Sequence, residues 1–151
     1  MSKQTIFKHN ITEWLDKVIA QPRKELGGMP ICPFIRKYMN NITIVESTSP
    51  MVIAKNFANL GHVLGVEAII VYGPKYSYDK LYNICDKINT AYEQQDVTCL
   101  AMHPDSIEPP LPLEYNFKWP ILILQKTSTL EHAQNMLKNT HYYSYFKKSA
   151  K

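Results

Sequence analysis

The chain of 151 residues lacks any apolar stretch that could cross a membrane, because no segment approaches the roughly 18 uninterrupted apolar residues that a span requires. Residues 1–10 are polar and lack the apolar segment of a signal peptide, so we expect a cytoplasmic protein. The sequence has only three cysteines, and they are widely spaced. This argues against a disulfide framework and against a zinc site built from paired cysteines.

Several sequence signatures of catalysis and phosphate binding are also missing. The chain has no glycine-rich phosphate loop, dinucleotide fingerprint, GxSxG nucleophile elbow or HExxH zinc helix. The formal net charge is +4, but the excess lysines lie mostly near the two ends and not along one element, which argues against nucleic-acid binding. With 45% hydrophobic and 20% charged residues, the composition is that of a single globular domain over 1–151.

Four helices are expected from apolar residues that recur at spacings of three and four. The first has Asn10 as its N-cap and Glu13 three residues on, which is the pattern of a capping box. The last opens with a second such pair, Ser128 and Glu131. The expected helices span approximately residues 11–19, 50–61 with an end as late as 65, 81–92 and 128–137.

Four apolar runs predict strands, at residues 42–45, 66–72, 97–102 and 121–124. Strands that are apolar on both faces and alternate with helices are typical of parallel sheets covered on both sides. We therefore expect an α/β fold with a mostly parallel, four-stranded sheet flanked by helices. Residues 104–119 contain four prolines and cannot hold an ordinary crossover helix, so we predict that this long loop covers a site.

His103 is the first candidate for chemistry, because ligands of open α/β sheets bind beyond the carboxyl ends of the strands. It follows the third predicted strand, and Pro104 stops that strand. An imidazole at this place can transfer protons or bind a metal, and Asp105 could orient it or act as a second acid. The alternative is that His103 only caps the strand through hydrogen bonds and that Asp105 is a turn residue.

Cys32 is the second candidate. It precedes Pro33, which is predicted to begin a short helix, so that the thiol would lie at the helix N-cap. The amides and dipole of a helix start, with Arg36 nearby, would lower the thiol pKa and make it a nucleophile or a metal ligand. The alternative is that Cys32 packs as a small hydrophobic residue in a rigid turn.

Residues that could hold or cover a small anion lie later in the chain. Lys126 and Ser128 mark the passage from the last strand into the last helix, where amides and a lysine can bind a carboxylate or phosphate. Lys118 and Trp119 end the proline-containing loop and could cover a ligand. The alternatives are a solvated lysine, a capping serine and an aromatic ring packed on the core.

Short motifs in the chain resemble a bacterial family known only as a domain of unknown function. Its members carry a tryptophan-containing first helix and a Leu-Cys-Pro-Phe-Ala turn, similar here to Trp14 and to residues 31–34. Their strand end Phe-His-Pro-Asp resembles residues 102–105, and their Pro-Met-Leu-His-Leu-Leu-Arg strand resembles residues 120–126 with lysine in place of arginine. The family has no assigned activity, so the resemblance supports a site at these segments and implies no reaction.

These observations predict a small enzyme that acts on a small anionic metabolite, with Cys32 as nucleophile and His103 as acid and base. Asp105 would assist, and Arg36 or Lys126 would hold the anion. A second hypothesis is that Cys32 and His103 bind a transition metal or haem. A third is a non-enzymatic interaction or regulatory protein that uses the proline-containing loop and the aromatic, basic tail at 141–151, a tail that could be flexible.

Overall fold

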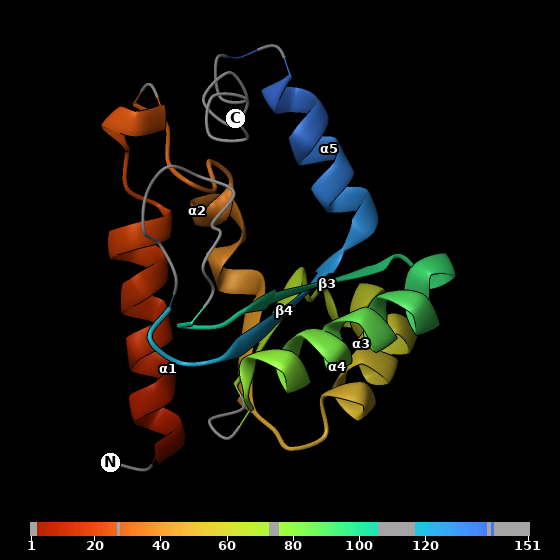
Figure 1. Ribbon diagram of the computed structural model, residues 1–151. Helices are drawn as coiled ribbons and strands as arrows, with labels where there is room; N and C mark the ends of the chain where they lie inside the picture. Colours follow the sequence, from red (N-terminus) through yellow and green to blue (C-terminus); the bar gives the residue numbers. More distant parts are fainter. Residues whose placement is uncertain (1–2, 27, 73–75, 106–116, 139, 141–151) are drawn as a thin grey trace.

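The computed structural model describes residues 3–26, 28–72, 76–105, 117–138 and 140. The predicted cover of the site, at 106–116, and the tail at 141–151 lie outside the described residues. Five α-helices and four strands are present in the described ranges (Figure 1): α1 (Lys3–Trp14), α2 (Ile35–Tyr38), β1 (Ile42–Glu46), α3 (Pro50–Leu64), β2 (Ala68–Tyr72), α4 (Tyr78–Tyr92), β3 (Val97–Met102), β4 (Ile121–Lys126) and α5 (Thr127–Leu137). Short helical turns are η1 (Leu15–Ile19, π-helical), η2 (Lys24–Leu26), η3 (Met39–Asn41) and η4 (Glu93–Gln95).

The four strands form one mixed sheet in the order β1-β2-β4-β3. β1 and β2 are parallel, whereas β4 is antiparallel to both β2 and β3. The α/β class and the four-stranded sheet are therefore confirmed, but the expectation of a mostly parallel sheet is wrong. A parallel neighbour requires a crossover connection, usually a helix, and the proline-containing segment between β3 and β4 was unsuited to one.

The direction of β4 decides which strand ends lie together. Its first residue, Ile121, pairs with Tyr72 at the end of β2 and with Met102 at the end of β3. Its carboxyl end lies beside the amino ends of the other strands, where Gln125 pairs with Ala68. Sequence-predicted site residues that follow β3 and β4 are therefore at opposite ends of the sheet.

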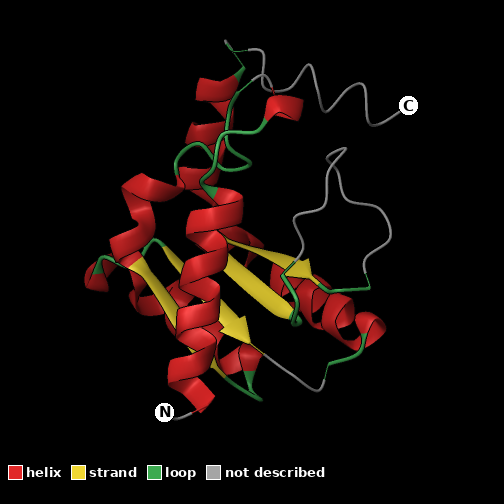
Figure 2. Cartoon of the chain, turned by 90° about the vertical axis from the view of Figure 1, so that its left-hand side faces the viewer, coloured by secondary structure: helices red, strands yellow, loops and turns green. Residues whose placement is uncertain are grey.

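Each face of the sheet has its own apolar core. One face packs against α3 and α4, and the other packs against α1 and η1 (Figures 1 and 2). Alternate residues of each strand point to opposite faces, so that Cys99 and Ala101 contact the α4 side whereas Met102 contacts the α1 side. None of the helices in the described ranges has the length and apolarity that crossing a bilayer requires.

The helix ends agree only in part with the sequence patterns. α3 begins at Pro50 and ends before Gly65, whose φ of +69° suits a residue without a side chain, as expected. The predicted cap at Asn10 is wrong, because α1 begins seven residues earlier, at Lys3, and continues through Asn10. Glu13 does not close a capping box there; its carboxylate instead pairs with Lys17 one turn later, at 2.5 Å.

The cap of α5 comes from a distant segment. The predicted capping box of Ser128 and Glu131 does not form, because α5 already begins at Thr127. Instead, the Asp96 carboxylate accepts a hydrogen bond from the Ser128 amide at 2.7 Å and another from the Ser128 hydroxyl at 2.7 Å. Asp96 thus satisfies a helix-start donor that a local side chain would ordinarily bond.

The free edge of β3 is occupied by one side chain. The Asn89 carboxamide, on α4, accepts a hydrogen bond from the Cys99 amide at 2.7 Å and donates one to the Cys99 carbonyl at 3.0 Å. β3 pairs with β4 on its other side only, so this edge would otherwise present unpaired backbone groups. Asn89 therefore pairs with the edge strand as a neighbouring strand would.

We predict that Asn89→Ala lowers the free energy of unfolding by about 1–3 kcal/mol, because it leaves partly buried backbone groups without their partner. Urea denaturation measured by circular dichroism gives this quantity. Asn83→Ala is the matched control, since Asn83 is exposed on the same helix. Equal stability losses in the two variants would contradict the assignment.

Candidate ligand-binding site

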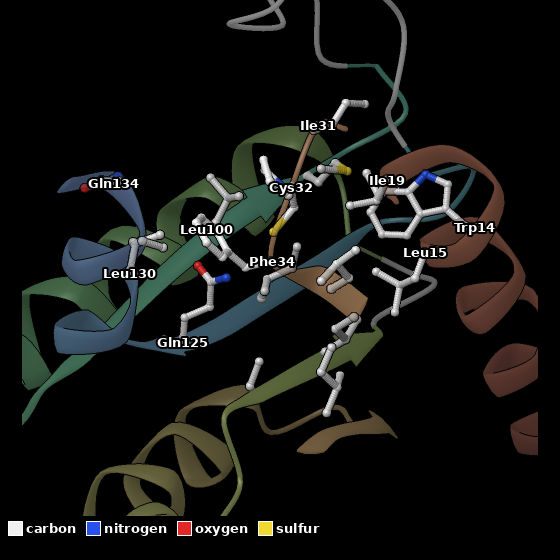
Figure 3. Close-up of a pocket in the computed structure, with 18 of the residues that line it drawn as sticks. Trp14, Leu15, Ile19, Ile31, Cys32, Phe34, Leu100, Gln125, Leu130 and Gln134 are labelled. Atoms are coloured by element: carbon white, nitrogen blue, oxygen red, sulfur yellow. The ribbon is translucent and has the colours of Figure 1, made fainter. Parts of the chain in front are cut away.

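A cavity of about 350 Å³ opens on the α1 side of the sheet, between η1, the Cys32 turn and α5. Its floor is the sheet, from which Leu100 of β3 and Gln125 of β4 point into it (Figure 3). One wall comes from Trp14 and the turn that contains Cys32, and the other comes from Leu130 on α5. The remaining lining residues are Leu15, Ile19, Ile31, Pro33, Phe34, Ile35, Ile42, Ala68, Ile70, Met102, Ile123, Ala133, Gln134 and Leu137.

The cavity lies where the helical cover of this face ends. At the other end of the same face, aromatic rings fill the space between α1 and the sheet. Phe7 stacks on Tyr72 with 4.1 Å between ring centroids, and Trp14 meets Phe117 edge-on at 5.4 Å. Among the described residues, Leu100 on the cavity floor remains 51% exposed. Apolar sheet surface is thus accessible to a ligand.

The lining is almost wholly apolar and contains no charged side chain among the described residues. Its polar side chains are the Cys32 thiol and the Gln125 and Gln134 amides. Pockets of a few hundred cubic ångströms, mostly apolar with a small number of polar groups, are typical of small-molecule binding sites. This composition suits an uncharged ligand.

Cys32 lies in a turn and not at a helix N-cap. The predicted helix start at Pro33 is wrong, because α2 begins at Ile35 and has only four residues. The Cys32 amide donates to the Ile19 carbonyl at 3.3 Å, which ties the turn to η1. Burial raises the pKa of the Cys32 thiol, and the amides of Phe34 and Ile35 offset this only in part. A protonated thiol is a poor nucleophile.

His103 is buried, with 7% of its surface exposed, and both ring nitrogens are bonded. Nδ1 accepts a hydrogen bond from the Asp105 amide at 3.0 Å, so Nε2 carries the proton and donates it to the Tyr76 carbonyl at 3.2 Å. The ring also meets Tyr78 edge-on at 6.0 Å between centroids. The Asp105 carboxylate is largely exposed, 3.7 Å from Nδ1. These contacts match the alternative in which His103 caps the strand.

The structure does not bring Cys32 and His103 together. Cys32 packs on the α1 side of the sheet, whereas His103 contacts the start of α4 on the other side. Within the described residues, no three His, Cys, Asp or Glu side chains gather where they could hold a metal ion. A shared Cys/His centre, whether catalytic or metal-binding, therefore has no geometric support.

The predicted anion-binding residues are engaged elsewhere. Arg36 pairs with Asp16 at 3.0 Å on the surface, and Lys126 lies 3.9 Å from Glu67 at the opposite end of the sheet from His103. Ser128 is bonded to Asp96. None of these side chains lines the cavity.

Lys118 and Trp119 also lie away from the cavity. The Lys118 ammonium is 4.6 Å from the centroid of the Trp119 ring and donates to the Asn10 side chain at 3.4 Å. The Trp119 ring packs against Phe7 and Tyr72. Trp119 therefore packs on the core, as in the alternative interpretation of the sequence.

Sequence reasoning placed Cys32 in a site but missed the residues opposite it. Leu130, Ala133 and Leu137 lie in the helix that was predicted at 128–137, and they form the cavity wall. Gln125 follows the strand that was predicted at 121–124, and a polar residue in register with Ile121 and Ile123 on an apolar strand face is a signal for a binding group.

We predict that alkylation of Cys32 by iodoacetamide has its pH midpoint above that of the same cysteine in the urea-unfolded chain. A raised pKa leaves less thiolate at a given pH, so Cys32 should be alkylated more slowly in the folded protein. Its alkylation rate should also begin to rise at a higher pH than in the unfolded chain. Peptide mapping by mass spectrometry distinguishes Cys32 from the two buried cysteines. A folded midpoint at or below the unfolded one would contradict this environment.

We predict that His103→Ala lowers the free energy of unfolding by about 1–3 kcal/mol, because the Tyr76 carbonyl and Asp105 amide lose their partner. His132→Ala, at an exposed position on α5, is the control and should change stability little. Thermal or urea unfolding gives both values. If the two variants were equally stable, the ring's hydrogen bonds would have no structural role.

The fold and cavity were also compared with known proteins. No protein-family model, curated protein or solved structure matches this chain.

Proposed function

We propose that this protein binds a small, uncharged and largely apolar molecule in the cavity between η1, the Cys32 turn and α5. The observation that carries the proposal is a cavity of about 350 Å³ whose described lining is apolar and free of charge. Transfer of apolar surface from water into such a site is favourable by about 25 cal/mol per Å². The driving force therefore comes chiefly from the ligand's hydrocarbon surface.

Two polar side chains would set the orientation of the ligand. The Cys32 thiol and the Gln125 amide point toward the cavity from different elements (Figure 3). An amide can both donate and accept a hydrogen bond, whereas a thiol is a weak partner. Gln125 is therefore the better anchor for a carbonyl, hydroxyl or amide group on an otherwise apolar molecule.

Binding is favoured over the predicted Cys/His enzyme by the surroundings of the thiol. Burial raises the pKa of Cys32, and no histidine, carboxylate or lysine lines the cavity within the described residues to remove its proton. A cavity without a cation also gives an anionic metabolite no partner. The proposed small-molecule site differs from all three hypotheses drawn from the sequence, and the loop and tail of the third hypothesis, at 106–116 and 141–151, lie outside the described residues.

We predict that the uncharged probe N-phenylnaphthylamine binds the full chain more tightly than its charged relative, anilinonaphthalene sulfonate. The two share an aromatic framework, and the sulfonate would have to be desolvated without a cation to receive it. Fluorescence titration of each probe gives the two Kd values. Tighter binding of the sulfonate would contradict an uncharged ligand and favour an anionic one.

We further predict that Ala133→Trp raises the Kd for N-phenylnaphthylamine by about tenfold or more, equivalent to about 1.4 kcal/mol, because the indole fills the cavity. Ala91→Trp is the matched control, since Ala91 is exposed on α4 across the sheet. Circular dichroism checks that both variants fold. Equal affinities in the two variants would place the bound probe outside this cavity.

A further inference from the structure

Two buried cysteines meet on the α4 side of the sheet, away from the ligand cavity. Cys85 of α4 is 6% exposed and Cys99 of β3 is 4% exposed. The Cys85 thiol lies 3.2 Å from the Cys99 carbonyl oxygen, to which it donates, and both side chains belong to the same buried core cluster. Both cysteines are reduced in this structure.

The two thiols are chemically unequal. The neighbouring Cys99 side chain lowers the pKa of Cys85, whereas the Cys85 side chain and burial raise the pKa of Cys99. Cys85 therefore loses its proton before Cys99 does. A thiolate is the form that attacks an oxidant, and a neighbouring thiol can then complete a disulfide.

A polar surface pocket is lined by a residue that contacts this pair. It has a volume of about 290 Å³ and includes Asn89, whose carboxamide also donates to the Cys85 sulfur at 3.6 Å. One side chain thus lies between the pocket and the sulfur. The pocket's other lining residues are Thr90, Glu93, Val97, Thr98 and Thr127, most of which are polar.

We propose that Cys85 and Cys99 form a redox-active pair that a small peroxide oxidises to an intramolecular disulfide. The Cys85 thiolate attacks one peroxide oxygen, the O–O bond breaks, and Cys85 becomes a sulfenic acid as one water leaves. The Cys99 sulfur then attacks the Cys85 sulfur, and its proton leaves with the sulfenic oxygen as a second water. Each thiol gives up one electron and hydrogen peroxide takes up two.

The reaction is selective for small oxidants because of the burial of both sulfurs. Hydrogen peroxide resembles water in size and polarity, so it suits a polar pocket closed by one carboxamide. A bulky disulfide such as oxidised glutathione would have to place its two sulfur atoms in line with the attacking thiolate, which is almost fully buried. The product disulfide would join α4 to the edge strand β3 and remove the Cys85 hydrogen bond to the Cys99 carbonyl.

The test uses the full chain with Cys32→Ser, so that of the three cysteines only the pair remains. Folded protein is treated with hydrogen peroxide, quenched, unfolded and assayed for free thiols and mass. Both thiols should disappear with a mass loss of about 2 Da, the two hydrogens given up in forming the bond. Trypsin cuts at Lys87, between the two cysteines, so the linked peptides should appear only without reductant.

Single-thiol variants supply the kinetic comparison. Adding Cys99→Ala to this background should stop disulfide formation and leave Cys85 about 16 Da heavier, as a sulfenic acid. Adding Cys85→Ala should slow loss of the remaining thiol about tenfold or more. Oxidised glutathione at equal concentration should act at least about tenfold more slowly than peroxide on the intact pair. Circular dichroism checks that each protein is folded.

Three results would overturn the proposal. The first is that peroxide leaves both thiols free in the folded Cys32→Ser chain, a measurement that needs no substitution in the core. The second is that the linked peptides come from two chains, as mixing isotopically labelled and unlabelled protein reveals. The third is equal rates with peroxide and with oxidised glutathione, which would exclude a site selective for small oxidants.

Discussion

The antiparallel placement of β4 between β2 and β3 is the constraint on which the rest of the structure depends. β4 pairs with β3 over residues 121–126 and with β2 over residues 121–125, so it joins the edge strand β3 to the parallel pair β1 and β2. Its direction brings α5, which follows without a loop, to the amino ends of the other strands. In a wholly parallel sheet α5 would begin beside His103, and the cavity would lose its second wall.

The cavity persists because both of its walls are held in place by hydrogen bonds. Apolar surfaces would ordinarily close a gap of this size, since contact with each other removes them from water. The start of α5 is held by the Asp96 carboxylate and by a 2.6 Å hydrogen bond between the hydroxyls of Thr98 and Thr127. The opposite wall is tied to η1 through the Cys32 amide. With both walls held, the sheet between them stays partly uncovered.

Local patterns in the sequence predicted the elements well. β3 has the expected bounds, and α4 ends at the expected residue, Tyr92. The direction of β4 was not predicted, because it depends on how a long proline-containing connection returns to the sheet. Periodicity is the same for a parallel and an antiparallel strand. The one available signal, the absence of a crossover helix, was interpreted as a site cover.

The candidate site was harder to predict, since its chemistry depends on contacts between distant segments. Cys32 was expected to have a lowered pKa from local sequence, whereas burial beneath η1 and beside α2 raises it. The position of His103 on the α4 face follows from its register with Cys99 and Ala101. No local pattern shows that the Cys32 turn packs on the other face. The capping of α5 by Asp96 is likewise a contact across 32 residues.

β3 connects the two proposed sites through adjacent residues. Cys99 faces α4, and Leu100, next in the chain, forms part of the cavity floor on the other face. A disulfide at Cys99 that displaces the strand would therefore also displace Leu100. Ligand binding and oxidation of the pair would then share one strand, and coupling between two such equilibria is reciprocal. A ligand that favours one position of β3 would change the free energy of oxidation, and oxidation would change the free energy of ligand binding by the same amount.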